Sequence, residues 1–219
     1  MASQAESLFN SKVAMANGKF LTHPSTQSFQ LRALLFSPST DIASQTQLKF
    51  SVQRGIRSSL ISQYPLLGEN DGAILEQIWP KKKPLVQVKC RGYVSLYTLD
   101  GVPVFSQHSN GPFFLTLKLL HQYPSLLPHL QVDRGAIKYL LAGANMMCPG
   151  FTSAGGRLPP PESAIPAKTL VAIHCEGKEH AAGIGITKLG TEEMKKVNKG
   201  VGVDIMAYLG DELWVIEKI

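Results

Sequence analysis

The stretch that decides the fold is VDRGAIKYLLAGANMMCPG, residues 132–150. Asp133 is a favourable helix N-cap, and the apolar residues that follow have the spacing of one buried helical stripe, at Ala136, Ile137, Leu140 and Leu141. The pattern stops at Gly143, a typical residue just beyond a helix end, and a short apolar run then leads to Pro149. The sequence therefore predicts a helix followed by a tight turn.

The same stretch indicates how a ligand could approach. Little side-chain bulk surrounds the predicted turn, because four of its residues are small: Gly135, Ala136, Gly143 and Ala144. Arg134 and Lys138 fall on the exposed side of the helix. A sugar–phosphate backbone needs such a close approach, since amide N–H groups can then bond its oxygens. We predict a nucleic-acid contact here; a helix packed on a sheet with a glycine turn is the alternative.

Composition limits the class of protein. The chain has 219 residues, enough for one large domain or two ordinary ones, and 44% of them are hydrophobic. No apolar run approaches the ~20 residues that cross a bilayer, so we expect a cytoplasmic protein without a membrane segment. Three widely spaced cysteines fit a reducing compartment. We interpret His174 and His180 as strand residues, and we predict no metal site and no cofactor.

Positive charge is concentrated in the first part of the chain. Residues 1–131 hold 12 Lys/Arg against 6 Asp/Glu, whereas residues 132–219 hold 10 of each, which accounts for the net charge of +6. This excess favours an anionic partner, nucleic acid rather than membrane, although a solvated basic surface would have the same composition. Lys81, Lys82 and Lys83 form the densest run, on a predicted loop that could contact consecutive phosphates. A nuclear-import patch or a solvated loop remains an alternative.

The chain begins with a stretch unlike the rest. Its first 36 residues are rich in Ser, Thr, Gln and Asn, and Glu6 is their single acid. We predict a disordered or weakly ordered extension over residues 1–47. A transit peptide or an alternative first exon would have a similar composition.

Residues 48–130 are predicted to form an N-terminal α+β domain. Val52, Ile56 and Leu60 fall four apart in a helix that ends before Pro65. Further helices are predicted at residues 71–79 and 116–123, and strands of an antiparallel meander at residues 84–90, 93–97 and 102–105. The dipeptide at residues 100–101, Asp-Gly, is a strong hairpin signal between two of these strands.

Residues 131–214 are predicted to form a small β-barrel-like domain. Strands are expected at residues 169–174, 181–186, 203–209 and 213–216, with a hairpin at Gly210 and Asp211 between the last two. Thr191 is expected to cap a brief helix. The fold class is therefore α+β throughout.

The residues give little support to catalysis. Residues 150–155 lack the spacing of a nucleophile elbow, and the glycines at residues 183 and 185 lie within a predicted strand rather than at the start of a helix. No pair of carboxylates is placed for acid–base work, so we predict no catalytic residues. An RNA-modifying enzyme or its accessory subunit is the alternative.

Five longer motifs carry a family resemblance: WPKKKP at residues 79–84, LLHQYP at 119–124, VDRGAIKY at 132–139, GANMMCPG at 143–150 and NKGVG at 198–202. In this order, over about residues 48–214, they resemble the malignant T-cell-amplified sequence family of translation factors. The resemblance implies that the second domain is a PUA domain, an RNA-binding pseudo-β-barrel.

The resemblance also implies a function. Members of the family act with density-regulated protein on the small ribosomal subunit, in tRNA release after termination, recycling, and translation initiation or reinitiation. By position, the glycine motif of PUA domains transfers to Gly135, Ala136, Lys138, Gly143, Ala144, Asn145, Met146 and Pro149. With Arg134, Lys81, Lys82 and Lys83, these residues form the candidate RNA-binding set, for tRNA or rRNA.

Two departures from the family concern the first domain. The family opens with a strand containing Phe and Lys just before the first helix, and here only residues 34–36 offer anything similar. Residues 68–72 look like an insertion between the first two helices. Both bear on the contact that this domain makes with a partner.

Overall fold

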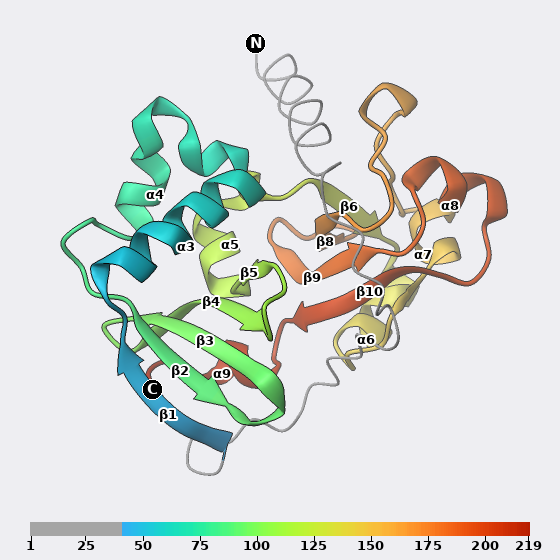
Figure 1. Cartoon of the computed structure of the whole chain (residues 1–219). Coiled ribbons are helices and arrows are strands. Elements are labelled where there is room, and N and C mark those ends of the chain that lie inside the picture. The colour runs from blue at the N-terminus through green and yellow to red at the C-terminus, as the bar shows by residue number, and fades with distance from the viewer. Residues whose placement is uncertain (1–40) are drawn as a thin grey trace. The chain divides into compact units, whose positions relative to one another are not determined.

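The computed structural model describes residues 41–219, which divide into two compact units (Figure 1). Within this range the first unit holds residues 41–126 and 212–219, and the second unit holds residues 127–211. Residues 1–40 of the extension predicted for residues 1–47, with the strand-like residues 34–36, lie outside the described residues. No helix among residues 41–219 has the length and apolarity needed to span a membrane.

The first unit is built on an antiparallel meander, as predicted. Its five strands follow one another in chain order across the sheet. They are β1 (Ile42–Gln47), β2 (Val86–Cys90), β3 (Val94–Leu99), β4 (Val102–His108) and β5 (Phe113–Leu115). Asp100 and Gly101 form the β3–β4 turn with φ values of 52° and 83°, as the hairpin signal requires.

Strand β1 corrects the prediction that order begins at Leu48. Four of its six residues are polar and five are exposed, so no apolar alternation marks it in the sequence. It forms because its backbone pairs with the edge of β2, from Ile42 opposite Cys90 to Gln47 opposite Val86. It is also the strand that precedes the first helix. Strand β5 was missed as well, since three consecutive buried residues show no period.

Helices of the first unit lie close to their predicted positions. They are α3 (Phe50–Gln63), α4 (Ala73–Ile78) and α5 (Leu117–Gln122), with 3₁₀ turns at η1 (Pro65–Gly68), η2 (Asn70–Gly72) and η4 (Pro124–Leu126). The insertion-like residues 68–72 are therefore folded into tight turns. The predicted stripe of α3 needs one correction. Val52 is exposed, and Gln53 takes its place because its buried amide donates to the Leu48 carbonyl at 2.7 Å.

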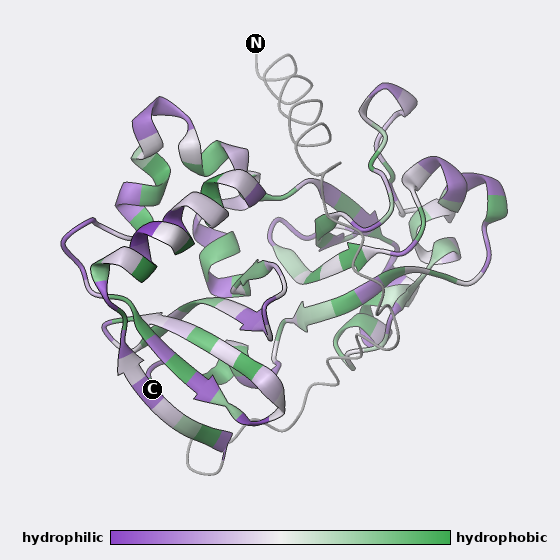
Figure 2. Cartoon of the chain, viewed as in Figure 1, coloured by the Kyte–Doolittle hydropathy of each residue, from purple (hydrophilic) through white to green (hydrophobic). Residues whose placement is uncertain are grey.

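The two faces of the first sheet have different covers. One face carries Tyr97 and Phe105, which are paired across β3 and β4, and here the Tyr64 hydroxyl of the helical layer donates to the Phe113 carbonyl at 2.6 Å. Figure 2 shows hydrophobic and hydrophilic residues alternating around these helices. The opposite face carries a small apolar cluster of Val88, Cys90 and Leu96, onto which Leu213 and Ile219 from the end of the chain pack.

The second unit is a mixed five-stranded sheet of order β6-β8-β9-β10-β7. Its strands are β6 (His129–Val132), β7 (Met146–Met147), β8 (Leu170–Cys175), β9 (Ala181–Thr187) and β10 (Val201–Tyr208). Only the β6–β8 pair is parallel. Short helical segments connect them: η5 (Arg134–Ala136), α6 (Ile137–Leu140), α7 (Cys148–Thr152), η6 (Pro161–Ser163) and α8 (Thr191–Val197).

Three expectations for the C-terminal part are wrong. Residues 213–216 were predicted as a strand, but α9 (Glu212–Val215) is a helix and lies in the first unit. Asp211 does not close a hairpin; its carboxylate accepts from the Tyr208 N–H at 3.0 Å and ends β10. Gly190, not Thr191, is the N-cap of α8, because the Thr191 hydroxyl instead accepts from the Ile165 N–H at 3.0 Å.

Candidate nucleic-acid interface

The turn at Asp133 is held by two carboxylates. Asp133 accepts from the Ala136 N–H at 2.8 Å, which confirms the predicted N-cap, and its second oxygen accepts from the Ser153 hydroxyl. The Glu176 carboxylate accepts from the Arg134 N–H at 3.2 Å and lies 3.7 Å from Nε of the Arg134 guanidinium. These carboxylates are therefore structural. A cap of this kind contributes about 0.5–2 kcal/mol.

Beyond the cap, the helical segment is shorter than predicted. One 3₁₀ turn and one α-turn end at Leu140, and Leu141 is exposed rather than buried. Tyr139 is also exposed, and the Lys138 ammonium lies 4.9 Å from the centre of its ring. The residues of this segment thus present a cation and a flat aromatic side by side. Tyr139 was not among the residues predicted from the sequence, although an aromatic residue six positions after a cap and next to a lysine is a visible signal for such a surface.

Gly143 serves the fold rather than a ligand. Its φ of 73° is the left-handed conformation expected just beyond a helix, and a Cβ there would lie 2.8 Å from the Tyr208 ring. The space beside Gly143, where we predicted the approach of a nucleic-acid backbone, is therefore filled by Tyr208 of the same unit. This corrects the predicted approach at Gly143.

The remaining predicted residues divide by exposure. Arg134, Gly135, Lys138, Ala144 and Pro149 are exposed, so a ligand can reach them. Ala136 packs against the core, the Asn145 amide oxygen accepts from the Ile205 N–H at 3.0 Å, and Met146 is buried. The Met146 side chain cannot contact RNA, because the alternation of β7 turns it inward.

A second group of cations lies beside α7. The Cys148 N–H donates to the Gly200 carbonyl at 2.9 Å, and the Thr152 hydroxyl donates to the Asn198 side chain, so the loop after α8 sits against the start of α7. Lys196 and Lys199 on that segment are exposed. The candidate RNA-binding set predicted from the sequence does not include these lysines, because the β7–β10 pairing that brings the two segments together has no local sequence signal.

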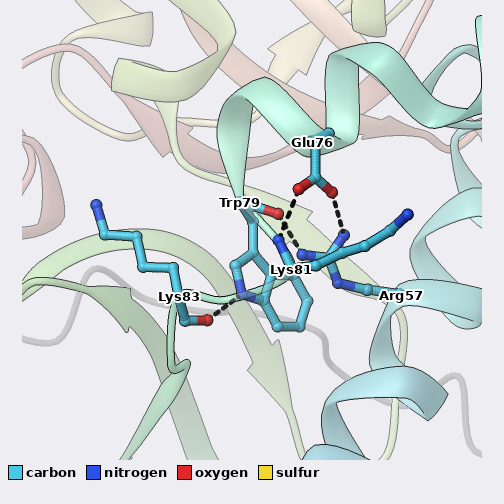
Figure 3. Close-up of polar contacts among 5 residues, drawn as sticks. All are labelled: Arg57, Glu76, Trp79, Lys81 and Lys83. Carbon is cyan, nitrogen blue, oxygen red and sulfur yellow. Dashed lines mark hydrogen bonds and ion pairs between the residues drawn. The ribbon is translucent and has the colours of Figure 1, made fainter.

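Lys81, Lys82 and Lys83 form a loop of the first unit, the lysine loop. It is anchored by Trp79 (Figure 3). The buried indole donates to the Lys83 carbonyl at 2.9 Å, and the Arg57 guanidinium lies 4.2 Å from the ring centre while donating to the Trp79 carbonyl. Glu76 completes the anchor, with an oxygen 3.6 Å from Arg57 and another accepting from the Lys81 N–H at 2.8 Å. Burial lowers the pKa of Arg57, and the Glu76 carboxylate opposes that effect.

Only part of the lysine run is available for phosphate. Lys81 and Lys82 are exposed, but the Lys83 ammonium is 2.6 Å from the Asp100 carboxylate at the β3–β4 turn. The prediction of three projecting cations is corrected to two. The side chains of Lys81 and Lys83 extend in different directions from Trp79 (Figure 3).

Comparison with known proteins identifies both units. A PUA domain model matches residues 128–209, and a Pre-PUA-like domain model matches residues 36–124. Malignant T-cell-amplified sequence 1-A of Xenopus laevis is 44% identical over 179 residues, which cover 82% of this chain and 94% of the relative. The chain belongs to the malignant T-cell-amplified sequence family. The resemblance and the predicted PUA domain are thereby confirmed.

Other relatives of this family member extend the same match. Translation machinery-associated protein 20 of Schizosaccharomyces pombe is 44% identical, over 82% of this chain and 95% of its own. Among solved structures, a hypothetical protein of Pyrococcus horikoshii has a TM-score of 0.59 at 19% identity, covering 78% of this chain and 98% of its own. A PUA domain from Aeropyrum pernix, in a tartrate complex, has a TM-score of 0.56 at 22% identity, over 78% and 89%. These two structures support the fold, which is α+β as predicted.

Within residues 41–219, no group of three His, Cys, Asp or Glu side chains could hold a metal ion. All three cysteines of this family member, Cys90, Cys148 and Cys175, are reduced and buried. Burial, reinforced by the charge of Asp41, raises the pKa of Cys90 to about 11. A thiol in this state is a weak nucleophile at neutral pH.

Proposed function

We propose that this chain is a non-catalytic, cytoplasmic translation factor that binds RNA and the small ribosomal subunit. The observation that carries the proposal is the exposed surface of the PUA domain at the Asp133 turn, where Arg134 and Lys138 flank small residues and the Tyr139 ring. Cations beside a flat aromatic can contact phosphate and stack on a base. The name of the yeast relative, translation machinery-associated, supports the same setting.

The finer part of the proposal follows the family resemblance. With density-regulated protein as its partner, the factor would act in tRNA release after termination, in recycling, and in initiation or reinitiation. Non-catalytic action is supported by the roles of the carboxylates, since Asp133 caps a turn, Glu176 holds Arg134 and Asp100 pairs with Lys83. A pull-down from cell lysate, with and without nuclease, tests whether small-subunit components and this partner are retained. Loss of both in untreated lysate would contradict the proposal.

The lysine loop gives the first prediction. Replacing Lys81 and Lys82 with Glu should weaken binding to purified small ribosomal subunits and lower the slope of log affinity against log salt by roughly 1.5–2, because two phosphate contacts disappear. Binding is measured across a salt series. Lys49→Glu with Lys218→Glu makes the same charge change at two other exposed lysines of the first unit. An equal fall in that control would show that overall charge, not the loop, is responsible.

RNA modification is the competing function, because an RNA-binding domain would serve it equally well. Mass spectrometry of tRNA and rRNA after incubation with the purified chain distinguishes the two. New modified nucleosides would overturn the non-catalytic proposal.

A further inference from the structure

The turn between β2 and β3 carries the most exposed large apolar side chain of the described residues. Tyr93 is 82% exposed, and Arg91 and Gly92 beside it are exposed too. Its ring is therefore not there to fill a core. The lysine loop and the Asp133 turn do not include this hairpin tip.

Tyr93 is also held in an unfavourable backbone conformation. Its φ is 63° and that of Gly92 is 73°, so both central residues of the turn are left-handed. Asn, Asp or Gly adopt this conformation readily, whereas a bulky side chain there is an outlier that costs free energy. The turn is fixed by the Ser109 N–H, which donates to the Tyr93 carbonyl at 2.7 Å. No burial of the ring offsets the strain, so packing does not explain a tyrosine at this position.

Two exposed cations lie within four residues of Tyr93 in the chain. Lys89 and Arg91 are exposed on either side of the buried Cys90. One carboxylate, Asp41, is close enough to raise the pKa of Cys90, which leaves this group of three charges at +1. A charge of this size can hold one phosphate but cannot by itself give tight binding. The aromatic ring has to supply most of the affinity.

We propose that Tyr93 stacks on an unpaired nucleobase, with Arg91 and Lys89 contacting the adjoining phosphates. The proposal rests on the proposed RNA-binding function and adds a third contact site, on the first unit. Any base offers a flat face to a tyrosine ring, so the contact would be tolerant of sequence. A protein partner fits less well, since protein interfaces bury a cluster of apolar side chains. Here Cys90 is buried and Val94 half-buried, which leaves Tyr93 as the one exposed apolar side chain of residues 89–94.

Because of the strain at Tyr93, one substitution should lower RNA affinity and raise stability at the same time, which distinguishes loss of a contact from loss of the fold. Tyr93→Asn in the full chain should weaken binding to a labelled, unstructured 20-nucleotide RNA roughly tenfold, the loss expected for one stacked base. The same variant should unfold about 2–4 °C higher, because Asn adopts the left-handed conformation at less cost. Tyr93→Phe should retain the wild-type affinity, since stacking does not need the hydroxyl group.

Phe50→Ser is the matched control, because Phe50 is another exposed aromatic of the first unit, 68% exposed at the start of α3. It should leave RNA affinity unchanged. Wild-type affinity in Tyr93→Asn, or an equal loss in Phe50→Ser, would overturn the stacking role. If the wild-type chain binds neither this RNA nor small subunits, the proposed function itself fails, and that outcome is distinct from a change confined to Tyr93.

Discussion

At the scale of single residues, Gly143 shows how a motif typical of ligand binding can also be a structural requirement. Its φ of 73° excludes most side chains, and the Tyr208 ring occupies the place of a Cβ. A bulky residue at Gly143 would therefore reduce RNA binding by unfolding the turn, whether or not RNA touches it. The contact has to be tested at exposed neighbours such as Lys138 and Tyr139.

A side chain at Gly143 would be destabilising for two reasons, the backbone strain at positive φ and the clash with the Tyr208 ring. A substitution at a second glycine with positive φ separates them. Gly200 has a φ of 80° with nothing within 4 Å of its would-be Cβ, so Gly200→Ala carries the backbone strain alone. We expect Gly200→Ala to lower the free energy of unfolding by about 1 kcal/mol. Gly143→Ala should lower it by roughly 1–3 kcal/mol more, because the Tyr208 ring must move. Urea denaturation measures both, and equal losses would mean that the ring yields without cost.

At the scale of elements, the C-terminal segment is the least expected part of the first unit. Leu213 and Ile219 pack on the cluster of Val88, Cys90 and Leu96. Polar contacts fix the segment at its middle and at its end: Lys118 donates to the Ile216 carbonyl at 2.6 Å, and the Ile219 N–H donates to the Gly101 carbonyl at 2.9 Å. The Trp214 ring contacts the His121 ring in a tilted arrangement, with 5.1 Å between centroids and an interplanar angle of 60°. These eight residues thus cover one face of the first sheet.

Deleting residues 212–219 should therefore uncover Cys90. We expect the free energy of unfolding of the first unit to fall by about 2–4 kcal/mol, the value of a few apolar side chains returned to water. The Cys90 thiol, whose pKa burial raises to about 11, should also react much faster with a disulfide reagent at pH 8. Cys148 and Cys175 lie in the core of the second unit and serve as internal controls. Unchanged protection of Cys90 would show that the segment is not its cover.

The elements that the sequence predicted correctly are those with a local signal. The Asp133 cap, the Asp100 turn and the helix around Ile56 each depend on neighbouring residues, and each is confirmed. Strand β1 and helix α9 have no such signal. Strand β1 forms by pairing with β2, and α9 packs on the first sheet, whose strands are far from it in the chain. The candidate site divides in the same way. Its cations could be read from the sequence, whereas the filled space at Gly143 and the Lys83 ion pair depend on Tyr208 and Asp100, which are distant in the chain.

At the scale of the whole molecule, charge and contact surfaces are distributed differently. The net charge of +6 arises within residues 1–131, yet the PUA surface has its own exposed cations, Lys138, Lys196 and Lys199, within a segment of zero net charge. Long-range attraction of RNA would therefore come mainly from the first part of the chain. Local contacts in the PUA domain would contribute geometry more than charge. Two weak surfaces on one chain gain affinity when a single partner spans both.

Combining one substitution in each unit can show whether a single partner binds both units at once. If one small ribosomal subunit contacts both units at once, the losses in binding free energy from Lys81→Glu and Lys138→Glu should add, because each weakens one factor of the same joint affinity. Each single loss should be roughly 1 kcal/mol, a phosphate contact with one lysine, and the double loss roughly 2 kcal/mol at one bound chain per subunit. Titration of purified subunits with the wild type, the two single variants and the double variant measures these losses and the stoichiometry. Two classes of site, each sensitive to only one of the substitutions, would show instead that the units bind independently.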